Sequence, residues 1–381
     1  MLPLIRLVAA PLLSLFFMMM GSGLFNTFVS IRLEMAGYTP ETIGVVTSAL
    51  YLGILVGSFR IDRWISKIGH IRSFVALAAS LAAIVLCQSF WLNAWYWSCL
   101  RFMGGICTAG VFVVIESWLL MQSVPNMRGG ILSIYLAVLY GALSSGQFLI
   151  DLSDPNGIFP FCITALLVVC SIFPISMKKI AEPKIGESGA RLNLIQLYRI
   201  SPLGFIGGVA SGIVLAVTYG LVPVYAKEIG MGVSEIGTFM AVLIFGGFSL
   251  QLPIGKWADR GDRRRVIKII SFATACLAMG VAWAPTTWLL FVLAWLFGGF
   301  AFTLYPVCMA YACERVKETE IVSATGGFVL SYGLGAIVGP LIAPVAMDLF
   351  GAAGVFYFLS LISLLLGVCG LKRPAPAMID K

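Results

Sequence analysis

The sequence predicts an all-α integral membrane protein whose twelve transmembrane helices form two pseudo-symmetric six-helix bundles. Three observations lead to this fold class. The 381 residues are 60% hydrophobic and only 11% charged, whereas soluble proteins carry about 25% charged residues. Apolar runs long enough to cross a bilayer recur along the whole chain. Almost all of the basic residues fall in segments that would share one side of the membrane.

Twelve apolar runs have the length that a membrane-spanning helix needs, which is roughly 20 residues. Two of the connections are weakly marked, since residues 71–120 and 266–312 are nearly continuous apolar stretches. Stretches of this length are too long to cross only once, so we place turns at Trp91–Trp95 and Ala284–Thr287. The predicted spans are 8–31, 42–61, 71–92, 94–120, 129–150, 158–177, 202–226, 234–256, 266–284, 286–312, 322–348 and 352–371.

The basic residues predict the orientation of the chain. With a cytoplasmic N-terminus, all but three of the 25 Lys and Arg residues lie in cytoplasmic segments. The exceptions are Arg32 and Lys227 on the outer side and Arg101 within the fourth span. This asymmetry follows the positive-inside rule and would be lost if one span were missing. Both termini are therefore predicted to be cytoplasmic.

A polar stretch from Lys178 to Arg199 divides the chain into two halves. We predict an N-terminal six-helix bundle at 1–180, a cytoplasmic linker at 181–200 and a C-terminal six-helix bundle at 201–381. The halves repeat weakly, because each carries a basic loop after its second span. Parallel six-helix halves with a binding site near the membrane midplane are a recurring plan of secondary transporters.

The composition argues against metal, cofactor and enzyme chemistry. The nine Cys residues lie in apolar stretches without metal-ligand spacing, and His70 is the only histidine. The spans also leave no length for a soluble catalytic module. The net charge of +8 fits basic cytoplasmic loops rather than a nucleic-acid partner. We therefore expect no cofactor, no metal and no nucleic acid.

The most specific motif is the segment from Gly255 to Arg265, which reads Gly-Lys-Trp-Ala-Asp-Arg-Gly-Asp-Arg-Arg-Arg. It resembles the Gly-x-x-x-Asp-Arg-x-Gly-Arg-Arg loop of the major facilitator superfamily, with Asp262 in place of the second glycine. The corresponding first-half loop is degraded: Ser66 stands at the aspartate position, and Asp62 lies one helical turn earlier.

The resemblance implies that these loops gate the transporter. We expect Asp259 to accept hydrogen bonds from the amides at the start of the next helix, and nearby arginines to bridge to acids of the other half. The alternative is a solvated basic loop that only sets topology. The gating candidates are Gly255, Asp259, Arg260, Arg263, Arg264, Asp62, Arg63, Gly69, Arg72, Glu116 and Arg128.

Other segments agree with this family. Arg101-Phe-Met-Gly-Gly105 resembles its Arg-x-x-x-Gly motif, and Glu116-Ser-Trp118 resembles a branch of small bacterial twelve-helix members. The glycine-rich segment from Gly333 to Pro340 predicts close helix packing and bending. The antiporter signature Gly-x-x-x-Gly-Pro is missing from the fifth span, which argues against a drug/proton antiporter.

Polar residues inside spans mark the predicted pathway, because the bilayer penalises them. Arg101 either faces a central cavity or binds helix-end carbonyls. Glu116 lies about 22 Å farther along the same helix and is expected to pair with Arg63, Lys67 or Arg128. No acid lies near the centre of a span, so the coupling ion stays open. The cavity candidates are Arg101, Asn26, Thr27, Tyr51, Tyr140, Gln147, Tyr219, Gln251, Tyr305 and Tyr332.

We interpret the chain as a secondary active transporter, not an enzyme. It is expected to move a small organic solute, anionic or amphipathic, across the bacterial inner membrane as a monomer by alternating access. Two other classes stay open. A non-transporting sensor or scaffold usually adds a soluble domain, and a membrane-embedded transferase needs an intramembrane histidine, paired acids or a metal cluster.

Overall fold

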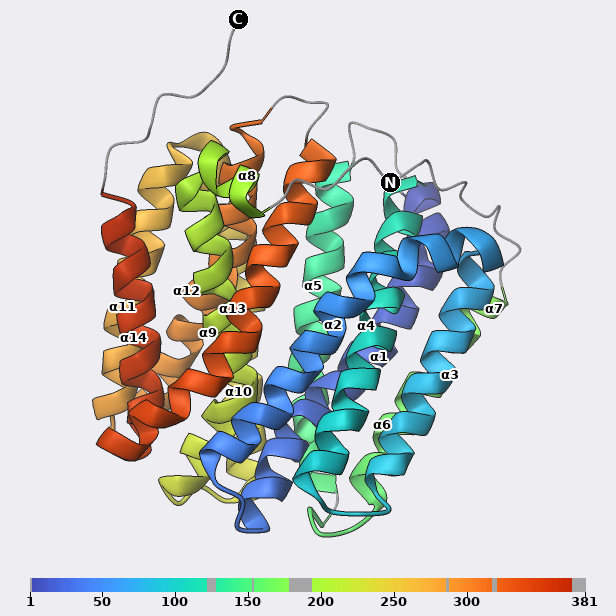
Figure 1. Ribbon diagram of the computed structural model, residues 1–381, viewed down its shortest axis with the longest axis horizontal. Helices are drawn as coiled ribbons and strands as arrows, with labels where there is room; N and C mark the ends of the chain where they lie inside the picture. Colours follow the sequence, from blue (N-terminus) through green and yellow to red (C-terminus); the bar gives the residue numbers. More distant parts are fainter. Residues whose placement is uncertain are drawn as a thin grey trace, which may run out of the picture. The chain divides into compact units, whose positions relative to one another are not determined.

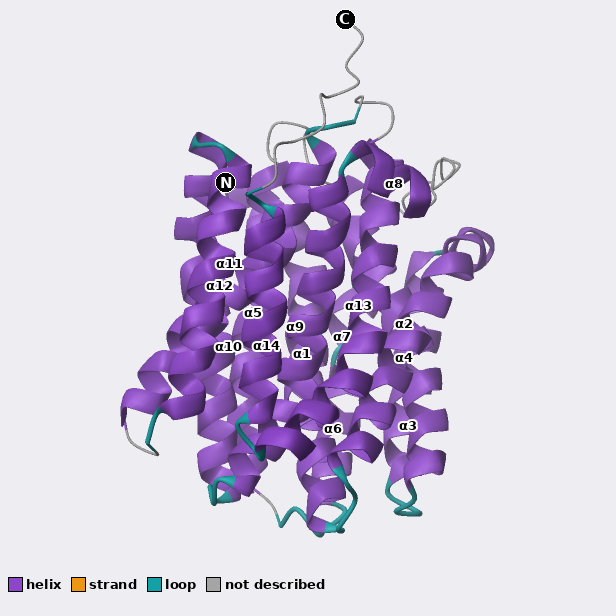
Figure 2. Cartoon of the chain, turned by 60° about the vertical axis from the view of Figure 1, so that its left-hand side comes forward, coloured by secondary structure: helices purple, strands orange, loops and turns teal. Residues whose placement is uncertain are grey.

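The computed structural model contains helices joined by short loops, and the part of the chain that it describes contains no strand (Figures 1 and 2). The described residues are 2–121, 128–152, 154–177, 194–285, 288–316 and 321–371. The predicted all-α membrane fold is confirmed. Eleven helices in these ranges are long and apolar enough to cross a membrane, and a twelfth apolar helix, Gly354–Cys369, is shorter.

The first half begins with four long helices: α1 (Leu2–Met35), α2 (Pro40–Ile68), α3 (His70–Gln88) and α4 (Ala94–Met121). The helix α5 (Arg128–Gln147) continues into a short 3-10 helix, η2 (Phe148–Leu152). The predicted sixth span forms α6 (Phe159–Cys170) and α7 (Ile172–Ser176), separated only by Ser171.

The second half contains α9 (Pro202–Glu228), α10 (Val233–Arg260), α11 (Arg263–Trp283), α12 (Trp288–Cys313), α13 (Ile321–Phe350) and α14 (Gly354–Cys369). Within the predicted linker, residues 194–200 form α8 (Leu194–Ile200), which packs on α9 and α13. The rest of that linker, 181–193, lies outside the described residues.

The chain divides into two compact units. Unit 1 comprises Met1–Ser188 and Gly232–Ala241, and unit 2 comprises Gly189–Met231 and Val242–Lys381. The first residues of α10 belong to unit 1 because they pack on α5. There, the Ser144 hydroxyl donates a hydrogen bond to the Ala241 carbonyl oxygen at 2.9 Å. A Cβ added at Gly237 would lie 2.9 Å from the Gln147 carbonyl oxygen.

Glycines set the closest helix contacts in unit 1. In α2 and α4, a Cβ on Gly53 would lie 2.0 Å from the Phe102 carbonyl oxygen, and one on Gly105 would lie 2.2 Å from that of Leu50. In α1 and α5, a Cβ on Gly23 would lie 2.3 Å from the Leu143 carbonyl oxygen. Without a side chain at these positions, the two backbones approach closely, as is common between membrane helices.

The same two kinds of helix pair recur in unit 2. Here α10 and α12 meet at Gly246 and Gly298, whose added Cβ atoms would each lie 1.9 Å from a carbonyl oxygen of the other helix. In α9 and α13, Gly212 and Gly335 make the equivalent approach, at 2.0 Å. Each unit therefore joins its first helix to its fifth and its second to its fourth through glycine.

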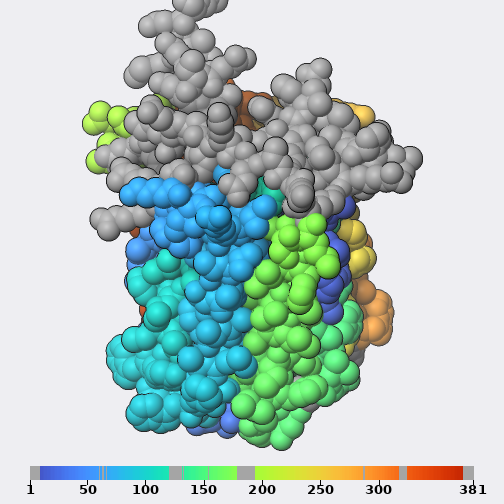
Figure 3. Space-filling view, turned by 90° about the vertical axis from the view of Figure 1, so that its right-hand side faces the viewer, coloured from blue at the N-terminus to red at the C-terminus, as the bar shows by residue number. Residues whose placement is uncertain are grey.

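Many large apolar side chains are exposed on the helices, as expected for a bilayer solvent. On one face of unit 1, α3 and α6 lie side by side (Figure 3). Leu166 of α6 and Phe173 of α7 are both exposed. The turns predicted at the two weakly marked connections are also flanked by exposed aromatic rings, which are typical of the membrane–water interface. These rings are Phe90, Trp91, Trp95, Trp283 and Trp288.

Candidate functional site

Arg101 is held on α4 against α1. Its Nη1 donates to the Asn26 side-chain oxygen at 2.8 Å, and its Nη2 donates to the Phe25 carbonyl oxygen at 3.3 Å. The guanidinium carbon lies 4.7 Å from the centre of the Phe25 ring, in a cation–π arrangement. The residue is only 7% exposed.

The charge of Arg101 has no carboxylate partner within 4.0 Å in the described ranges. Its contacts there are an amide oxygen, a carbonyl oxygen and an aromatic face, all of them neutral. A guanidinium has five N–H donors, and these two hydrogen bonds come from two of its nitrogens. The arrangement can both tie α4 to α1 and offer positive charge to an anion.

Three more cavity candidates of unit 1 are deeply buried. The Gln147 side-chain nitrogen donates to the Gly23 carbonyl oxygen at 2.8 Å, which links α5 to α1. Its side-chain oxygen and the hydroxyl of Thr27 are buried without a described hydrogen-bond partner. Tyr140 is also buried. The structure therefore brings Asn26 to Arg101, whereas Gln147 acts at the α1–α5 contact.

The cavity candidates of unit 2 include an aromatic group. The ring of Tyr305 on α12 contacts the rings of Tyr332 and Phe328 on α13, with centroids 5.0 Å and 5.3 Å apart. Tyr219 on α9 makes an edge contact of 5.5 Å with Phe302. Gln251 on α10 is half-buried, and its side-chain oxygen lacks a described partner. These side chains offer rings and hydroxyls but no formal charge.

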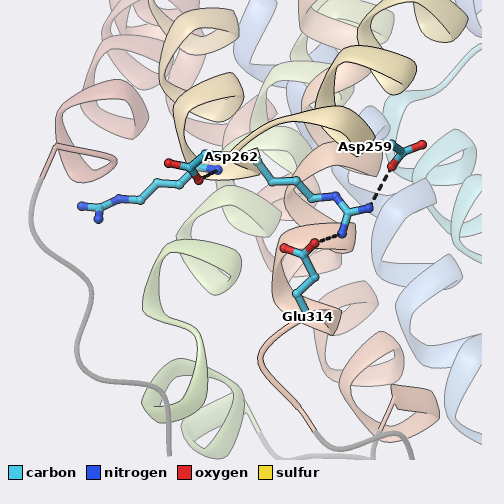
Figure 4. Close-up of polar contacts among 5 residues, drawn as sticks. Asp259, Asp262 and Glu314 are labelled. Atoms are coloured by element: carbon cyan, nitrogen blue, oxygen red, sulfur yellow. Dashed lines mark hydrogen bonds and ion pairs between the residues drawn. The ribbon is translucent and has the colours of Figure 1, made fainter. Parts of the chain in front are cut away.

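The motif loop between α10 and α11 forms an ion-pair cluster (Figure 4). Arg263 Nη2 lies 2.8 Å from the Asp259 carboxylate, and Arg263 Nη1 pairs with the carboxylate of Glu314, just after α12. The arginine thus connects the end of α10 to the end of α12. Sequence reasoning missed Glu314, since nothing in the order of residues indicates that the end of α12 lies beside this loop.

Asp262, rather than Asp259, caps α11. The Asp262 carboxylate accepts a hydrogen bond from the Arg264 backbone N–H at 2.9 Å, and Asp262 has the extended backbone of an N-cap residue. The expectation that Asp259 would fill this role is wrong, because Asp262 directly precedes the helix. The departure from the family's glycine thus supplies the cap.

The other residues of this loop differ in their surroundings. Arg264 Nε donates to the Gly370 carbonyl oxygen at 2.9 Å and so ties α11 to the end of α14. Arg260 is exposed, and a Cβ on Gly255 would have nothing within 4 Å. Gly255 is therefore not a close-packing glycine.

The first-half loop is a tight turn at Gly69. Gly69 alone separates α2 from α3, and its φ of 94° lies where side chains are strained. Arg72 is exposed. The gating predictions for the side chains of Asp62, Arg63 and Arg128 lie outside the described residues.

Glu116 on α4 accepts a hydrogen bond from the Tyr135 hydroxyl of α5 at 2.8 Å. The sequence predicts a basic partner instead. Of the three expected residues, Lys67 makes no described ion pair with it, and the side chains of Arg63 and Arg128 are not described. Tyrosine is a partner that spacing alone does not indicate, because it comes from another helix.

Comparisons with known proteins agree on one family. A sequence model of the Major Facilitator Superfamily matches residues 12–247 and 204–380. The uncharacterized MFS-type transporter YcaD of Salmonella typhi is 30% identical over 363 residues, covering 94% of this chain and 93% of the relative. YcaD of Salmonella typhimurium matches to the same extent.

Solved structures show the same fold at low sequence identity. The nucleoside transporter NupG has a TM-score of 0.79 at 15% identity, covering 96% of this chain and 98% of its own. A D-xylose–proton symporter has a TM-score of 0.79 at 14% identity, covering 99% of both chains. The human organic anion transporter MFSD10 has a TM-score of 0.69 at 14% identity, covering 97% and 99%.

Proposed function

Because the chain belongs to the major facilitator superfamily, we propose that it moves a small organic anion across the cytoplasmic membrane by alternating access. Secondary transport is the function of this protein class, and the curated relatives and solved neighbours are transporters rather than enzymes. The substrate class, a small organic anion, is an inference that goes beyond membership of the family. It is supported by one side chain, Arg101.

Arg101 supports an anionic substrate because its charge is held inside the membrane span without a described carboxylate partner. A charged side chain in such a position is costly unless function or pairing compensates for it. Its described hydrogen bonds go to neutral oxygens, so a substrate carboxylate would add the opposite charge. The planar guanidinium suits bidentate recognition of that group.

The aromatic group of unit 2 supports an organic rather than an inorganic anion. Tyr305 and Tyr332 bring rings and hydroxyls together with little charge, a lining that suits the carbon skeleton of a solute. In this proposal, Arg101 binds the charged end of the solute. One structural neighbour, MFSD10, is described as an organic anion transporter.

We further propose that the ion-pair cluster gates transport on the cytoplasmic side. Arg263 connects two helix ends through Asp259 and Glu314, so movement of either end would break one of its contacts. A contact made in only one conformation biases the equilibrium toward that conformation. The excess of basic residues in the loops on this side supports a cytoplasmic position for the cluster and for both termini.

Variants of Arg101 test the substrate class. Proteoliposomes with purified protein would be assayed for uptake of labelled monocarboxylates, dicarboxylates and organic phosphates, and ligand binding would be measured by the shift in melting temperature. We expect Arg101→Gln and Arg101→Lys to weaken binding of the transported anion by about 1–3 kcal/mol, with Gln the worse. Lys227→Gln, which removes a basic residue at the end of α9, should bind as the parent does.

Two outcomes would contradict the proposal. If folded Arg101→Gln protein binds and transports with unchanged affinity, Arg101 only ties α4 to α1. Binding without uptake of any solute would instead favour a sensor. The melting temperature of the ligand-free variants separates a loss of binding from a loss of folding.

A further inference from the structure

Unit 1 contains a cavity of about 200 Å³ at the ends of its helices. Arg32, near the end of α1, and Gln88, the last residue of α3, lie on its wall. Trp97 at the start of α4 and Asn156 in the loop before α6 also line it. Four separate segments therefore converge on one small space.

Gln88 lines this cavity, and its side-chain amide carries an unused hydrogen-bond donor. The residue is only 1% exposed, and its side-chain nitrogen is buried without a described hydrogen-bond partner. Its backbone carbonyl is fixed, because the Trp97 indole nitrogen donates to it at 3.0 Å. A buried donor left unpaired costs free energy, so a ligand that accepts from this nitrogen would remove that cost.

Arg32 brings positive charge to the same wall. Its Nη1 donates to the Asn156 side-chain oxygen, which is neutral, and in the described ranges no carboxylate lies within 4.0 Å of it. The nearest acid along this loop, Asp154, accepts a hydrogen bond from the Asn156 backbone N–H. The cavity thus joins a guanidinium without an acidic partner to a free amide donor.

An aromatic cluster lies between this cavity and Arg101. The ring of Phe161, which lines the cavity, contacts the rings of Phe25, Phe28 and Trp97 at 5.9, 4.9 and 6.0 Å. Phe25 also contacts the Arg101 guanidinium. The cavity is therefore a different place from the proposed substrate contact.

The cavity lies at the level of a membrane–water interface. The turn next to Gln88 carries Phe90 and Trp91, and α4 begins with Trp95, all of them strongly exposed. Exposed rings of this kind sit at the depth of lipid headgroups. The anions concentrated at that depth are phosphates.

We propose that this cavity binds a phosphate group, through the Arg32 guanidinium and the Gln88 amide. Arginine matches the tetrahedral oxygens of phosphate with parallel N–H donors, and the Gln88 nitrogen adds a neutral donor. The phosphate can belong to a phospholipid headgroup or to a free phosphate anion, and the same donors serve both. The proposal does not depend on which face of the membrane this end occupies.

Melting temperatures of the purified protein test the proposal in three arms. The additions are sodium phosphate, compared with sodium chloride at equal ionic strength; a short-chain phosphatidylglycerol; and a diacylglycerol with the same acyl chains but no phosphate. We expect phosphate, phosphatidylglycerol or both to raise the melting temperature. A shift with the lipid alone identifies a headgroup site, and one with the salt alone identifies a soluble anion site.

Three variants show whether the site causes the shift. Arg32→Gln should weaken the apparent affinity about tenfold or more. Gln88→Leu should weaken it less and leave the ligand-free protein folded, because the removed amide nitrogen has no described partner. Lys227→Gln is the matched control, since Lys227 is the basic residue near the end of α9 as Arg32 is near the end of α1.

The proposal is overturned if neither phosphate nor phosphatidylglycerol stabilises the parent protein. It is also overturned if diacylglycerol stabilises as well as phosphatidylglycerol, because the acyl chains would then be enough. It is overturned as well if Lys227→Gln and Arg32→Gln weaken the apparent affinity equally, because the overall positive charge of the protein would then explain the binding. If Arg32→Gln fails to fold, unchanged affinity in folded Gln88→Leu protein overturns the proposed contact.

Discussion

Adding a single methyl group at Gly53 should force α2 away from α4. The Cβ of Gly53→Ala would lie 2.0 Å from the Phe102 carbonyl oxygen and 3.0 Å from the Gly105 Cα. Contacts between carbon and oxygen normally need about 3.3 Å, so the helices must separate by roughly 1.3 Å there. The obstacle is backbone, and a backbone carbonyl cannot rotate aside as a side chain would.

The expected loss of stability follows from two opposing terms. Overpacking of a well-packed contact costs typically about 1–3 kcal/mol, and a rigid backbone obstacle favours the upper end. Alanine gains up to about 1 kcal/mol of helix propensity over glycine. We therefore expect a net loss of about 2 kcal/mol, which for a chain of 381 residues is a fall in melting temperature of roughly 2–3 °C.

The measurement is the apparent melting temperature of the purified protein in detergent, at one fixed heating rate because unfolding of such proteins is often irreversible. Gly246→Ala should behave in the same way, since its Cβ would lie 1.9 Å from the Trp295 carbonyl oxygen. Gly141→Ala is the control, because its Cβ meets nothing within 4 Å. A Gly53→Ala protein that melts with the parent would refute the packing argument.

Three further predictions concern the loop between α10 and α11 and the topology. Asp259→Asn should change stability by less than about 1 kcal/mol, as for exposed ion pairs, yet slow transport in proteoliposomes; transport at the parent rate would leave the loop as a topology determinant only. Asp262→Ala should lower stability by about 1 kcal/mol through loss of the N-cap, measured against Asp262→Asn, which keeps a capping oxygen; equal melting temperatures would contradict the capping role. Cysteines placed at Arg264 and Lys227 in a Cys-free background should react with an impermeant maleimide in intact cells only at position 227, and labelling at 264 would reject the predicted orientation.

The helices could be predicted from the sequence because the bilayer imposes a simple rule. Each span must be long and apolar, so run length alone located the twelve helices and the two weakly marked turns. The glycine contacts were only partly foreseeable. The Gly333–Pro340 segment predicted close packing, and Gly335 and Gly339 do approach α9. Which helix each glycine would meet depends on the fold.

The partners of the polar residues could not be predicted for the same reason. Glu314 pairs with Arg263, which lies 51 residues earlier in the chain, and Tyr135 of α5 donates to Glu116 of α4. The Asn26–Arg101 hydrogen bond joins α1 to α4. Sequence spacing relates residues within one helix through its periodicity, but it does not specify which helices are neighbours. The candidate residues were thus identifiable as polar groups in spans, and their roles were not.

The exposure of the ion-pair cluster limits its contribution to the stability of the fold. The side chains of Asp259 and Glu314 are 68% and 52% exposed, whereas that of Arg263 is 20% exposed. Such pairs contribute at most about 1 kcal/mol to stability, so the fold does not depend on them. A functional effect must therefore come from a difference between conformations, since contacts that are equal in both states shift no equilibrium. For this reason the melting temperature of Asp259→Asn does not test the gating role of the cluster. The transport rate of this variant does.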